Sequence, residues 1–241
     1  MKIKMFNVRL LNVRLTGILV RIGHILFYRV VVDNAELLYE RLFANKLNSL
    51  GLENEYFGIG SAANYSYLYL ISRIVGELNV KNILELGAGE STRLLNSMST
   101  VRDINITTLE EDKVWAERIA SKVSHQIVHA PLSNYSVFGK LTKGYGNVLH
   151  GEKFDMMLID GPIGTRRNSR FCSIEYVFKN LSINNFVIVL DDVNRKGEQD
   201  TLKAILEELD SRSIQYQYKV KKSVKFQAVI ASGRFIEAVY F

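Results

Sequence analysis

Residues 82–92 read Asn-Ile-Leu-Glu-Leu-Gly-Ala-Gly-Glu-Ser-Thr, and this stretch decides the fold. The run 83–86, apolar apart from one acid, has the length of a buried strand and stops at a turn that contains Gly87 and Gly89. A helical pattern follows from Thr92 to Met98. Strand, glycine turn and helix in this order form the unit on which doubly wound α/β proteins hold an adenosine-containing ligand. We expect glycine here because a side chain would block close approach of the backbone, and because the turn needs positive φ.

The turn departs from a dinucleotide fingerprint, because Ser91 stands where a third glycine is expected. One carboxylate, Glu85, precedes the turn, and another, Glu90, lies inside it. Two acids beside a loop suit a cationic ligand better than a pyrophosphate. S-adenosylmethionine carries a sulfonium and an ammonium group, so the turn favours S-adenosylmethionine as the ligand.

The composition indicates one globular protein. The chain has 241 residues, a length that is enough to bury one substantial core. Of these residues 47% are hydrophobic and only two are proline. The single cysteine, Cys172, excludes an intramolecular disulfide, fits a reducing compartment and is interpreted as a small core residue on a helix. The net charge of +6 permits an acidic partner and selects none.

The N-terminal part differs from the rest, and we divide the chain into a basic, apolar and helical extension (1–55) and an α/β domain (56–241). Residues 1–32 contain six lysines and arginines and no acid. Basic residues and a histidine interrupt the apolar stretch, which argues against a membrane span. No small-residue cleavage site follows the apolar part, which argues against a signal peptide. Peripheral contact with an anionic membrane and self-association through the apolar face both stay open. Residues 34–50 predict a helix that ends at Gly51.

After the glycine turn the chain alternates between apolar runs and helical patterns. Continuous apolar runs of this kind predict a mainly parallel sheet covered on both faces, and the last two predict an antiparallel pair. The expected strands lie near 83–86, 104–109, 126–129, 154–159, 186–190, 214–220 and 226–231, and the expected helices near 62–78, 92–98, 113–123, 170–181 and 199–209.

Glu110 ends the second apolar run, 21 residues after Gly89. This is the interval at which an acid meets the ribose hydroxyls in the dinucleotide version of the fold. The alternative is an exposed acid at a helix N-terminus, which is how we interpret Glu111 and Asp112. Trp115 would either flank the adenine or pack on the sheet.

Asp160, Asp191 and Asp192 each follow the last apolar residue of a run. Neighbouring parallel strands bring their ends within about 5 Å, so the three carboxylates should converge. Unpaired, they would repel one another, and an all-oxygen set of this kind suits Mg²⁺ or Mn²⁺. The alternative is that one of the two adjacent aspartates caps the following loop while Arg195 pairs with the other.

The loop 161–170 follows Asp160 and contains Arg166, Arg167 and Arg170. These side chains would hold a carboxylate or phosphate of a substrate, or they would simply form an exposed basic loop. The histidines show no metal-ligand spacing. His150 lies in a glycine-containing loop (143–153) and is a minor candidate for a catalytic base.

From 58 to 232 the chain resembles class I S-adenosylmethionine-dependent methyltransferases. Residues 83–92 resemble the first motif of that superfamily, 108–115 its second-strand acid, and 154–162 and 187–195 its fourth and fifth strand ends. The Asp after the fourth strand and the Asp-Asp after the fifth resemble cation-dependent O-methyltransferases. The same segments are similar to the glucuronoxylan 4-O-methyltransferase family, although the plant members have His-Asp where this chain has Asp191-Asp192, and 130–132 lacks the acid that often reads the adenine amino group.

The resemblance implies a Rossmann-like class I methyltransferase fold and an enzyme that methylates a sugar hydroxyl of a surface polysaccharide or its precursor. The expected cofactors are S-adenosyl-L-methionine and a divalent cation, Mg²⁺ or Mn²⁺, and the carbohydrate substrate is expected to be anionic. Asp160 would also accept the hydroxyl proton. We expect a cytoplasmic protein, peripheral at the inner membrane face if 1–32 binds lipid, and no nucleic-acid partner. The alternatives are a phenolic or nucleic-acid methyltransferase and a non-catalytic scaffold protein.

The predicted cofactor contacts are Glu85, Gly87, Gly89, Ser91 and Glu110, the metal ligands Asp160, Asp191 and Asp192, and the substrate contacts Arg166, Arg167 and Arg170.

Overall fold

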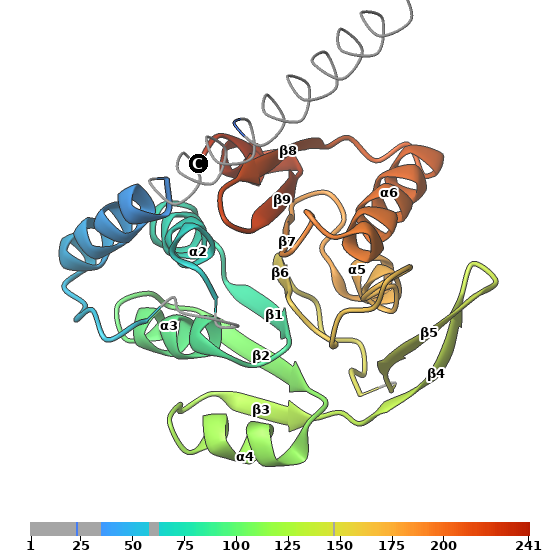
Figure 1. The fold of residues 1–241 in the computed structure, drawn as a ribbon, viewed down its shortest axis with the longest axis horizontal. Coiled ribbons are helices and arrows are strands. Elements are labelled where there is room, and N and C mark those ends of the chain that lie inside the picture. Colours follow the sequence, from blue (N-terminus) through green and yellow to red (C-terminus); the bar gives the residue numbers. More distant parts are fainter. Residues whose placement is uncertain (1–22, 24–34, 58–62, 147) are drawn as a thin grey trace, which may run out of the picture.

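The computed structural model describes residues 23, 35–57, 63–146 and 148–241. Its centre is a seven-stranded sheet with the order β3-β2-β1-β6-β7-β9-β8 (Figure 1). Five strands are parallel, and β9 runs antiparallel to both of its neighbours, β7 and β8. The predicted Rossmann-like sheet with an antiparallel C-terminal pair is confirmed. The strands are β1 (Asn82–Leu86), β2 (Asn105–Glu110), β3 (Gln126–His129), β6 (Met156–Ile159), β7 (Val187–Leu190), β8 (Gln217–Lys222) and β9 (Phe226–Ala231).

Helices cover both faces of the sheet. Because successive side chains of a strand point to opposite faces, Ile83 packs with one set of helices and Leu84 with the other. The first face is covered by the helical residues 35–50, α2 (Tyr65–Glu77), α3 (Glu90–Ser99) and the 3₁₀ segment η1 (Gly233–Tyr240), and the second by α5 (Ser173–Asn180) and α6 (Lys196–Ser211). The short helix α4 (Lys113–Ala120) lies beside β3 at one edge (Figure 1).

The helix over residues 35–50 ends where the sequence predicts. Gly51 has a φ of +71° and its N–H bonds to the carbonyl of Asn48 at 3.1 Å, which is the usual role of glycine after a helix. Phe43 and Leu47 are fully buried in the same core as α2 and α3. The described part of the N-terminal region therefore shares the core of the α/β domain, while the domain boundary at residue 55 stays a prediction.

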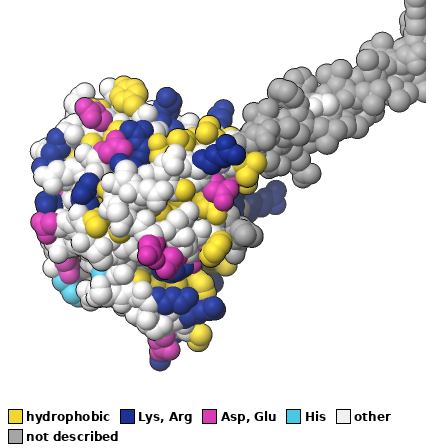
Figure 2. All heavy atoms as spheres, turned by 90° about the vertical axis from the view of Figure 1, so that its left-hand side faces the viewer, with side chains coloured by type: hydrophobic (Ala, Val, Ile, Leu, Met, Phe, Trp, Pro, Cys, Tyr) yellow, Lys and Arg dark blue, Asp and Glu magenta, His cyan; other side chains and the backbone are white. Residues whose placement is uncertain are grey.

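Residues 1–22, 24–34, 58–62 and 147 lie outside the described residues, and so do the predictions of a membrane-binding or self-associating segment at 1–32. No helix in the described part of the chain combines the length and the apolar character that crossing a membrane requires. On the face that carries the helix over 35–50, the basic and acidic side chains of the described residues are scattered among hydrophobic and other side chains (Figure 2).

A hairpin projects from the carboxyl-end side of the sheet and was not predicted. It consists of β4 (Leu132–Val137) and β5 (Lys140–Tyr145), which pair only with each other. Both turn residues have positive φ, Phe138 at 48° and Gly139 at 71°, as the tight two-residue turns of hairpins require. The expected loop from 143 is therefore wrong in its first three residues, which are strand.

Candidate active site

The glycine turn after β1 packs against the turn after β6. The N–H of Gly161 donates to the carbonyl of Leu86 at 2.6 Å, and a Cβ on Gly87 would lie 2.8 Å from the Gly161 nitrogen. Gly87 also has a φ of +93°, so glycine is required there by the backbone and by a neighbouring segment of the same chain. Our expectation that glycine makes room for a ligand suits Gly89, where an added Cβ would meet nothing within 4 Å.

Glu85 lies in the core of the first face, where its neighbours on the strand are apolar. Its side chain is fully buried and accepts hydrogen bonds from Ser91 Oγ at 2.6 Å and Thr108 Oγ1 at 2.9 Å. Burial raises the pKa of Glu85 to about 7, although these hydrogen bonds oppose the shift. Thr108 is also 3.2 Å from Nε2 of His125, whose pKa burial lowers to about 4. The structure thus brings the predicted contacts Glu85 and Ser91 together as one buried pair.

Glu110 lies beside the glycine turn, as predicted. Its carboxylate accepts from the backbone N–H of Ala88 and from that of Asp112, both at 2.8 Å. Asp112 caps α4 by accepting from the N–H of Trp115 at 2.7 Å, so its interpretation as a helix-terminal acid is confirmed. The indole N–H of Trp115 donates to the carbonyl of Ala88 at 2.7 Å, which fixes the ring next to the turn.

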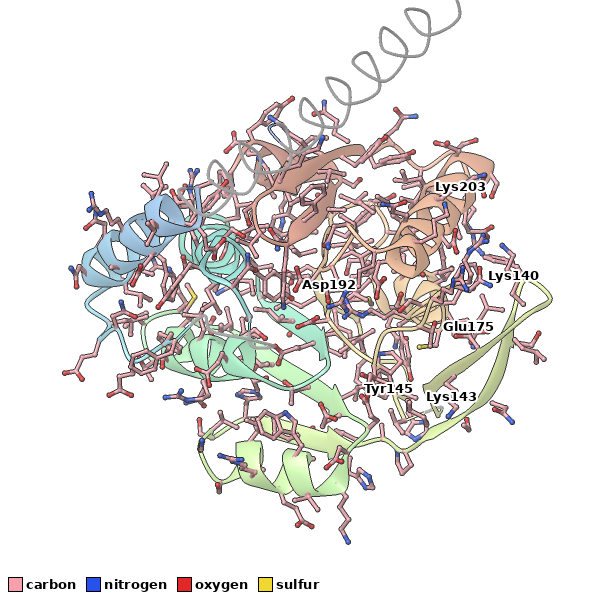
Figure 3. The ribbon with its side chains drawn as sticks, viewed as in Figure 1. Lys140, Lys143, Tyr145, Glu175, Asp192 and Lys203 are labelled. Atoms are coloured by element: carbon pink, nitrogen blue, oxygen red, sulfur yellow. The ribbon has the colours of Figure 1, made fainter. Side chains whose placement is uncertain are left out.

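Glu111 has a role that sequence reasoning missed, because we interpreted it as an exposed helix-terminal acid. It accepts from the Tyr145 hydroxyl at 3.2 Å and from the N–H of Ile163 at 2.8 Å. Tyr145 lies at the end of β5 nearest the main sheet (Figure 3), and a Cβ on Gly161 would collide with its hydroxyl. Glu111 therefore joins the end of β2, the hairpin and the loop after β6.

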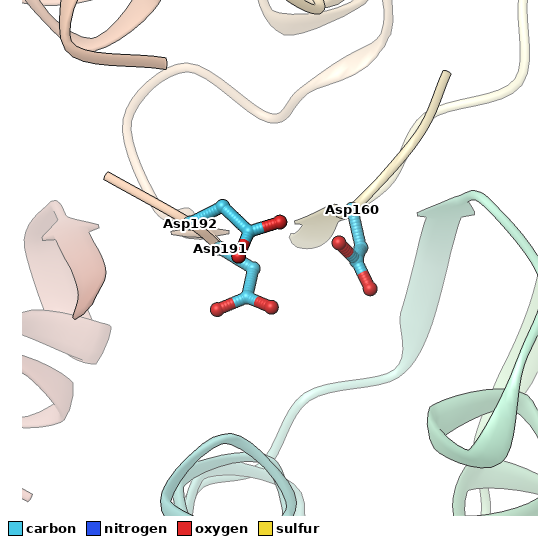
Figure 4. Close-up of side chains that lie close together, drawn as sticks. All are labelled: Asp160, Asp191 and Asp192. Carbon is cyan, nitrogen blue, oxygen red and sulfur yellow. The ribbon is translucent and has the colours of Figure 1, made fainter. Parts of the chain in front are cut away.

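The three predicted metal ligands converge at the ends of β6 and β7 (Figure 4). Ile159 and Leu190 are register partners in the parallel pair, so the residues that follow them, Asp160 and Asp191, are neighbours. One carboxylate oxygen from each of Asp160, Asp191 and Asp192 lies within 4.8 Å of the others. Asp191 is fully buried, whereas the side chain of Asp160 is 28% exposed, so the cluster is open on one side.

Arg170 lies inside this cluster, which the sequence did not indicate. Its Nη2 is 3.0 Å from both Asp160 Oδ1 and Asp192 Oδ2, and its Nε is 3.8 Å from Glu198 Oε1. Only 3% of the Arg170 side chain is exposed. The structure therefore places Arg170 as a buried counterion of the acids. Arg195, on the other side, is 2.9 Å from Asp192 Oδ2, so the ion pair that we considered as an alternative to a metal is present.

The charges of the cluster are incompletely balanced. Burial and the neighbouring carboxylates raise the pKa of Asp191 to about 7, opposed by Lys225 and Gln227. Burial also raises the pKa of Asp160, and Arg170 opposes that shift. Among the described residues, Asp191 Oδ2 and Asp192 Oδ1 are buried without a hydrogen-bond partner. Unsatisfied buried carboxylate oxygens are costly, and their presence is what a cation site would explain.

Tyr67 is a second residue that the sequence did not single out. It lies on α2, is fully buried, and its hydroxyl has no hydrogen-bond partner among the described residues. Burial, together with the nearby carboxylates of Asp160, Asp191 and Glu85, raises its pKa well above the usual range. The hydroxyl therefore lies close enough to the carboxylate cluster and to Glu85 to be affected by their charges.

The remaining candidates lie elsewhere. Arg167 pairs with Asp200 at 2.6 Å, and Arg166 is exposed. His150 is exposed. Cys172 is a buried residue whose pKa burial raises to about 12. Its interpretation as a core residue is confirmed, although it lies directly before α5 and not on a helix.

No protein-family model matches the sequence, and no curated protein matches it. Solved structures are similar in fold only. A methyltransferase from Podospora anserina with bound SAH has 14% identity and a TM-score of 0.48, covering 84% of this chain and 95% of that one. A methyltransferase from Pyrococcus furiosus has 16% identity and a TM-score of 0.45, covering 83% and 96%. A precorrin-6y C5,15-methyltransferase from Geobacter metallireducens has 17% identity and a TM-score of 0.45, covering 76% and 97%. The fold assignment therefore depends on the order and direction of the strands.

Proposed function

We propose that this chain is an S-adenosylmethionine-dependent O-methyltransferase that uses a divalent cation and methylates a sugar hydroxyl. The observation that carries the proposal is the position of the three aspartates beside the glycine turn. Asp160 N and Gly161 N both bond to Leu86 O, at 3.0 and 2.6 Å, directly before that turn. A cofactor on the turn and a substrate at the carboxylates would therefore be neighbours.

Each part of the cofactor would meet a suitable group. Glu110, with its two carboxylate oxygens held by backbone N–H groups, would accept from the ribose hydroxyls. Gly89 leaves open space for close approach. Gly87 and the buried pair of Glu85 and Ser91 would shape the turn that receives the cationic end of the ligand.

The carboxylates fit a divalent cation. Asp160, Asp191 and Asp192 offer only oxygen ligands, two of their buried oxygens are unsatisfied, and Asp160 is accessible from solvent. When bound, an Mg²⁺ or Mn²⁺ ion would lower the pKa of a substrate hydroxyl and orient it. Asp160 would accept the hydroxyl proton, a role that suits a carboxylate whose pKa is raised by burial.

For the substrate, a sugar is favoured over the alternatives by the sequence resemblance alone. Arg166, exposed in the loop after Asp160, is the arginine best placed to meet an anionic sugar. Arg167 would have to leave Asp200 and Arg170 would have to leave the aspartates before either could bind a substrate. Arg170 is therefore assigned to the support of the carboxylates.

The proposal is tested by titrating the full-length protein with S-adenosylmethionine by calorimetry, with and without Mn²⁺, and then by following transfer of a labelled methyl group. The acceptor panel contains uronic-acid oligosaccharides, neutral oligosaccharides, catechol and RNA. We expect cofactor binding and transfer to a sugar that stops in EDTA and resumes with Mn²⁺. Transfer to catechol or RNA alone would reject the sugar, full activity of Asp191→Asn in EDTA would reject the cation, and absence of cofactor binding would favour the scaffold protein.

A further inference from the structure

A chain of buried hydrogen bonds starts at Asp191 and leads away from the site. Because Leu190 pairs with Ala228 in the antiparallel ladder of β7 and β9, the next residues along the two strands, Asp191 and Gln227, lie side by side. Gln227 is fully buried and its Nε2 donates to Asp191 Oδ1 at 2.8 Å. Asp191 Oδ2 is the oxygen left without a hydrogen-bond partner among the described residues.

The amide of Gln227 is held in one orientation. Its Oε1 accepts from Ser66 Oγ at 3.1 Å, and its Nε2 also reaches Asn64 Oδ1 at 3.3 Å. Rotating the amide by half a turn would place its oxygen against the Asp191 carboxylate. The partners of Gln227 therefore ensure that a donor faces Asp191 and fixes one carboxylate oxygen. The other oxygen, Oδ2, is 3.9 Å from Lys225 Nζ and accepts no hydrogen bond from the described residues.

The outer end of the chain is Glu36, near the start of the helix over residues 35–50. Its carboxylate accepts from Asn64 Nδ2 at 3.1 Å, from the N–H of Ser66 at 3.2 Å and from Ser223 Oγ at 3.1 Å. Ser66 belongs to the first turn of α2, and Asn64 makes no side-chain cap there. Glu36 thus supplies, from another helix, an acceptor of the kind that stabilises a helix N-terminus.

We infer that Gln227 is a positioning residue for Asp191, and that Glu36 makes the helix over residues 35–50 part of the support of the site. The inference depends on the proposed cation site, because it concerns the orientation of one of the ligands. Residues that hold metal ligands by hydrogen bonds typically change metal affinity 10–100-fold when they are removed. The N-terminal region accordingly has a function in the α/β domain through four connected side chains: Glu36, Asn64, Ser66 and Gln227.

The test is a double-mutant cycle on the full-length protein, with Mn²⁺ alone as the probe. Mn²⁺ affinity is measured by calorimetry for the wild type, Gln227→Met, Glu36→Gln and the double variant. We expect Gln227→Met to weaken binding about 10–100-fold, Glu36→Gln to weaken it less, and the double variant to match Gln227→Met. Ser232→Ala is the matched control, since Ser232 is also buried at an end of β9 but donates to the Gln215 carbonyl at 2.7 Å; it should change affinity less than twofold.

Equal Mn²⁺ affinity in the wild type and Gln227→Met would overturn the positioning role. Additive effects in the double variant would overturn the connection to Glu36, because independent sites add and coupled ones do not. Gln227→Asn, which keeps the amide but withdraws it from Asp191, replaces Gln227→Met should the latter fail to fold. If the wild type binds no Mn²⁺, the proposed cation fails, and crystal structures of the wild type and Gln227→Met decide the inference: an unmoved Asp191 carboxylate refutes it, and a rotated one supports it.

Discussion

Replacing Arg170 with methionine would show how strongly the aspartates depend on their buried counterion. The guanidinium lies 3.0 Å from Asp160 and from Asp192, and its side chain is 3% exposed. Removing one partner of a buried ion pair leaves an uncompensated charge and typically costs about 3–5 kcal/mol, a large part of the roughly 5–15 kcal/mol by which domains are stable. Methionine keeps the Cβ and an unbranched side chain, so the backbone is perturbed little.

Arg167→Met is the matched control, because Arg167 belongs to the same loop and also pairs with an aspartate. Its side chain is 63% exposed at 2.6 Å from Asp200, and exposed ion pairs contribute at most about 1 kcal/mol. We therefore expect urea unfolding at pH 8 to show a loss of about 3–5 kcal/mol for Arg170→Met and a much smaller loss for Arg167→Met.

Lowering the pH and adding Mn²⁺ should both reduce the difference in unfolding free energy between Arg170→Met and Arg167→Met. Arg170 opposes the raised pKa of Asp160, so without the guanidinium that pKa would rise further in the folded protein. Folding would then take up a proton, and Arg170→Met would regain stability as the pH falls. Mn²⁺ would stabilise the folded variant by mass action if it binds the aspartates. Equal losses in the two variants, or an Arg170→Met deficit that is the same at pH 8 and at pH 5.5, would refute the counterion role and return Arg170 to the substrate contacts.

Four further substitutions test three separate features. Gly161→Ala should destabilise the protein by about 1–3 kcal/mol, because the new Cβ collides with the Tyr145 hydroxyl. Gly89→Ala, with open space around it, should leave urea unfolding unchanged and weaken S-adenosylhomocysteine binding. Similar urea unfolding of the two alanine variants would contradict this difference between the two glycines. The pKa of Glu85 is raised to about 7, so its stabilising contribution is complete below the pKa of the unfolded chain and is lost as the pH rises through 7. Relative to Glu85→Gln, the wild type should therefore lose about 3 kcal/mol of unfolding free energy between pH 5 and pH 8. A difference in unfolding free energy between the two proteins that does not depend on pH would reject the raised pKa. Tyr67→Phe removes a buried hydroxyl without a partner and should raise the unfolding free energy of the ligand-free protein by about 1 kcal/mol, and a loss of stability would show that the hydroxyl has a partner.

The parts of the fold that the sequence predicted are those with local signals. β6 and β7 are continuous apolar runs, and each is followed at once by aspartate. Parallel register then brings Asp160 and Asp191 together without any further information. Gly51 and Asp112 likewise end or begin their helices for reasons that lie within a few residues.

The parts that were not predicted depend on contacts between residues far apart in the chain. Nothing near Arg170 in sequence indicates that Asp192 and Glu198 will surround it, and three arginines in one loop look alike until their partners are known. The same holds for Glu111, whose partners come from the hairpin and from the loop after β6. The hairpin carried a weak local signal, Phe138-Gly139 between short runs, which the neighbouring glycines obscured.

The charges around the aspartates explain why this site would bind a cation and still fold without one. The cluster contains four carboxylates, each within 4 Å of at least one of three cationic side chains. The carboxylates are those of Asp160, Asp191, Asp192 and Glu198, and the cations are Arg170, Arg195 and Lys225. One negative charge is therefore in excess (4 − 3). A proton on Asp191, whose pKa of about 7 allows it near neutral pH, removes that excess in the empty protein. A divalent cation in place of that proton would take the cluster from no net charge to one positive charge, which a substrate hydroxyl would balance by losing its own proton. Arg170 therefore sets the balance: without it the carboxylates of the empty site would repel one another, and a fourth fixed cation would leave no negative charge for a metal to neutralise.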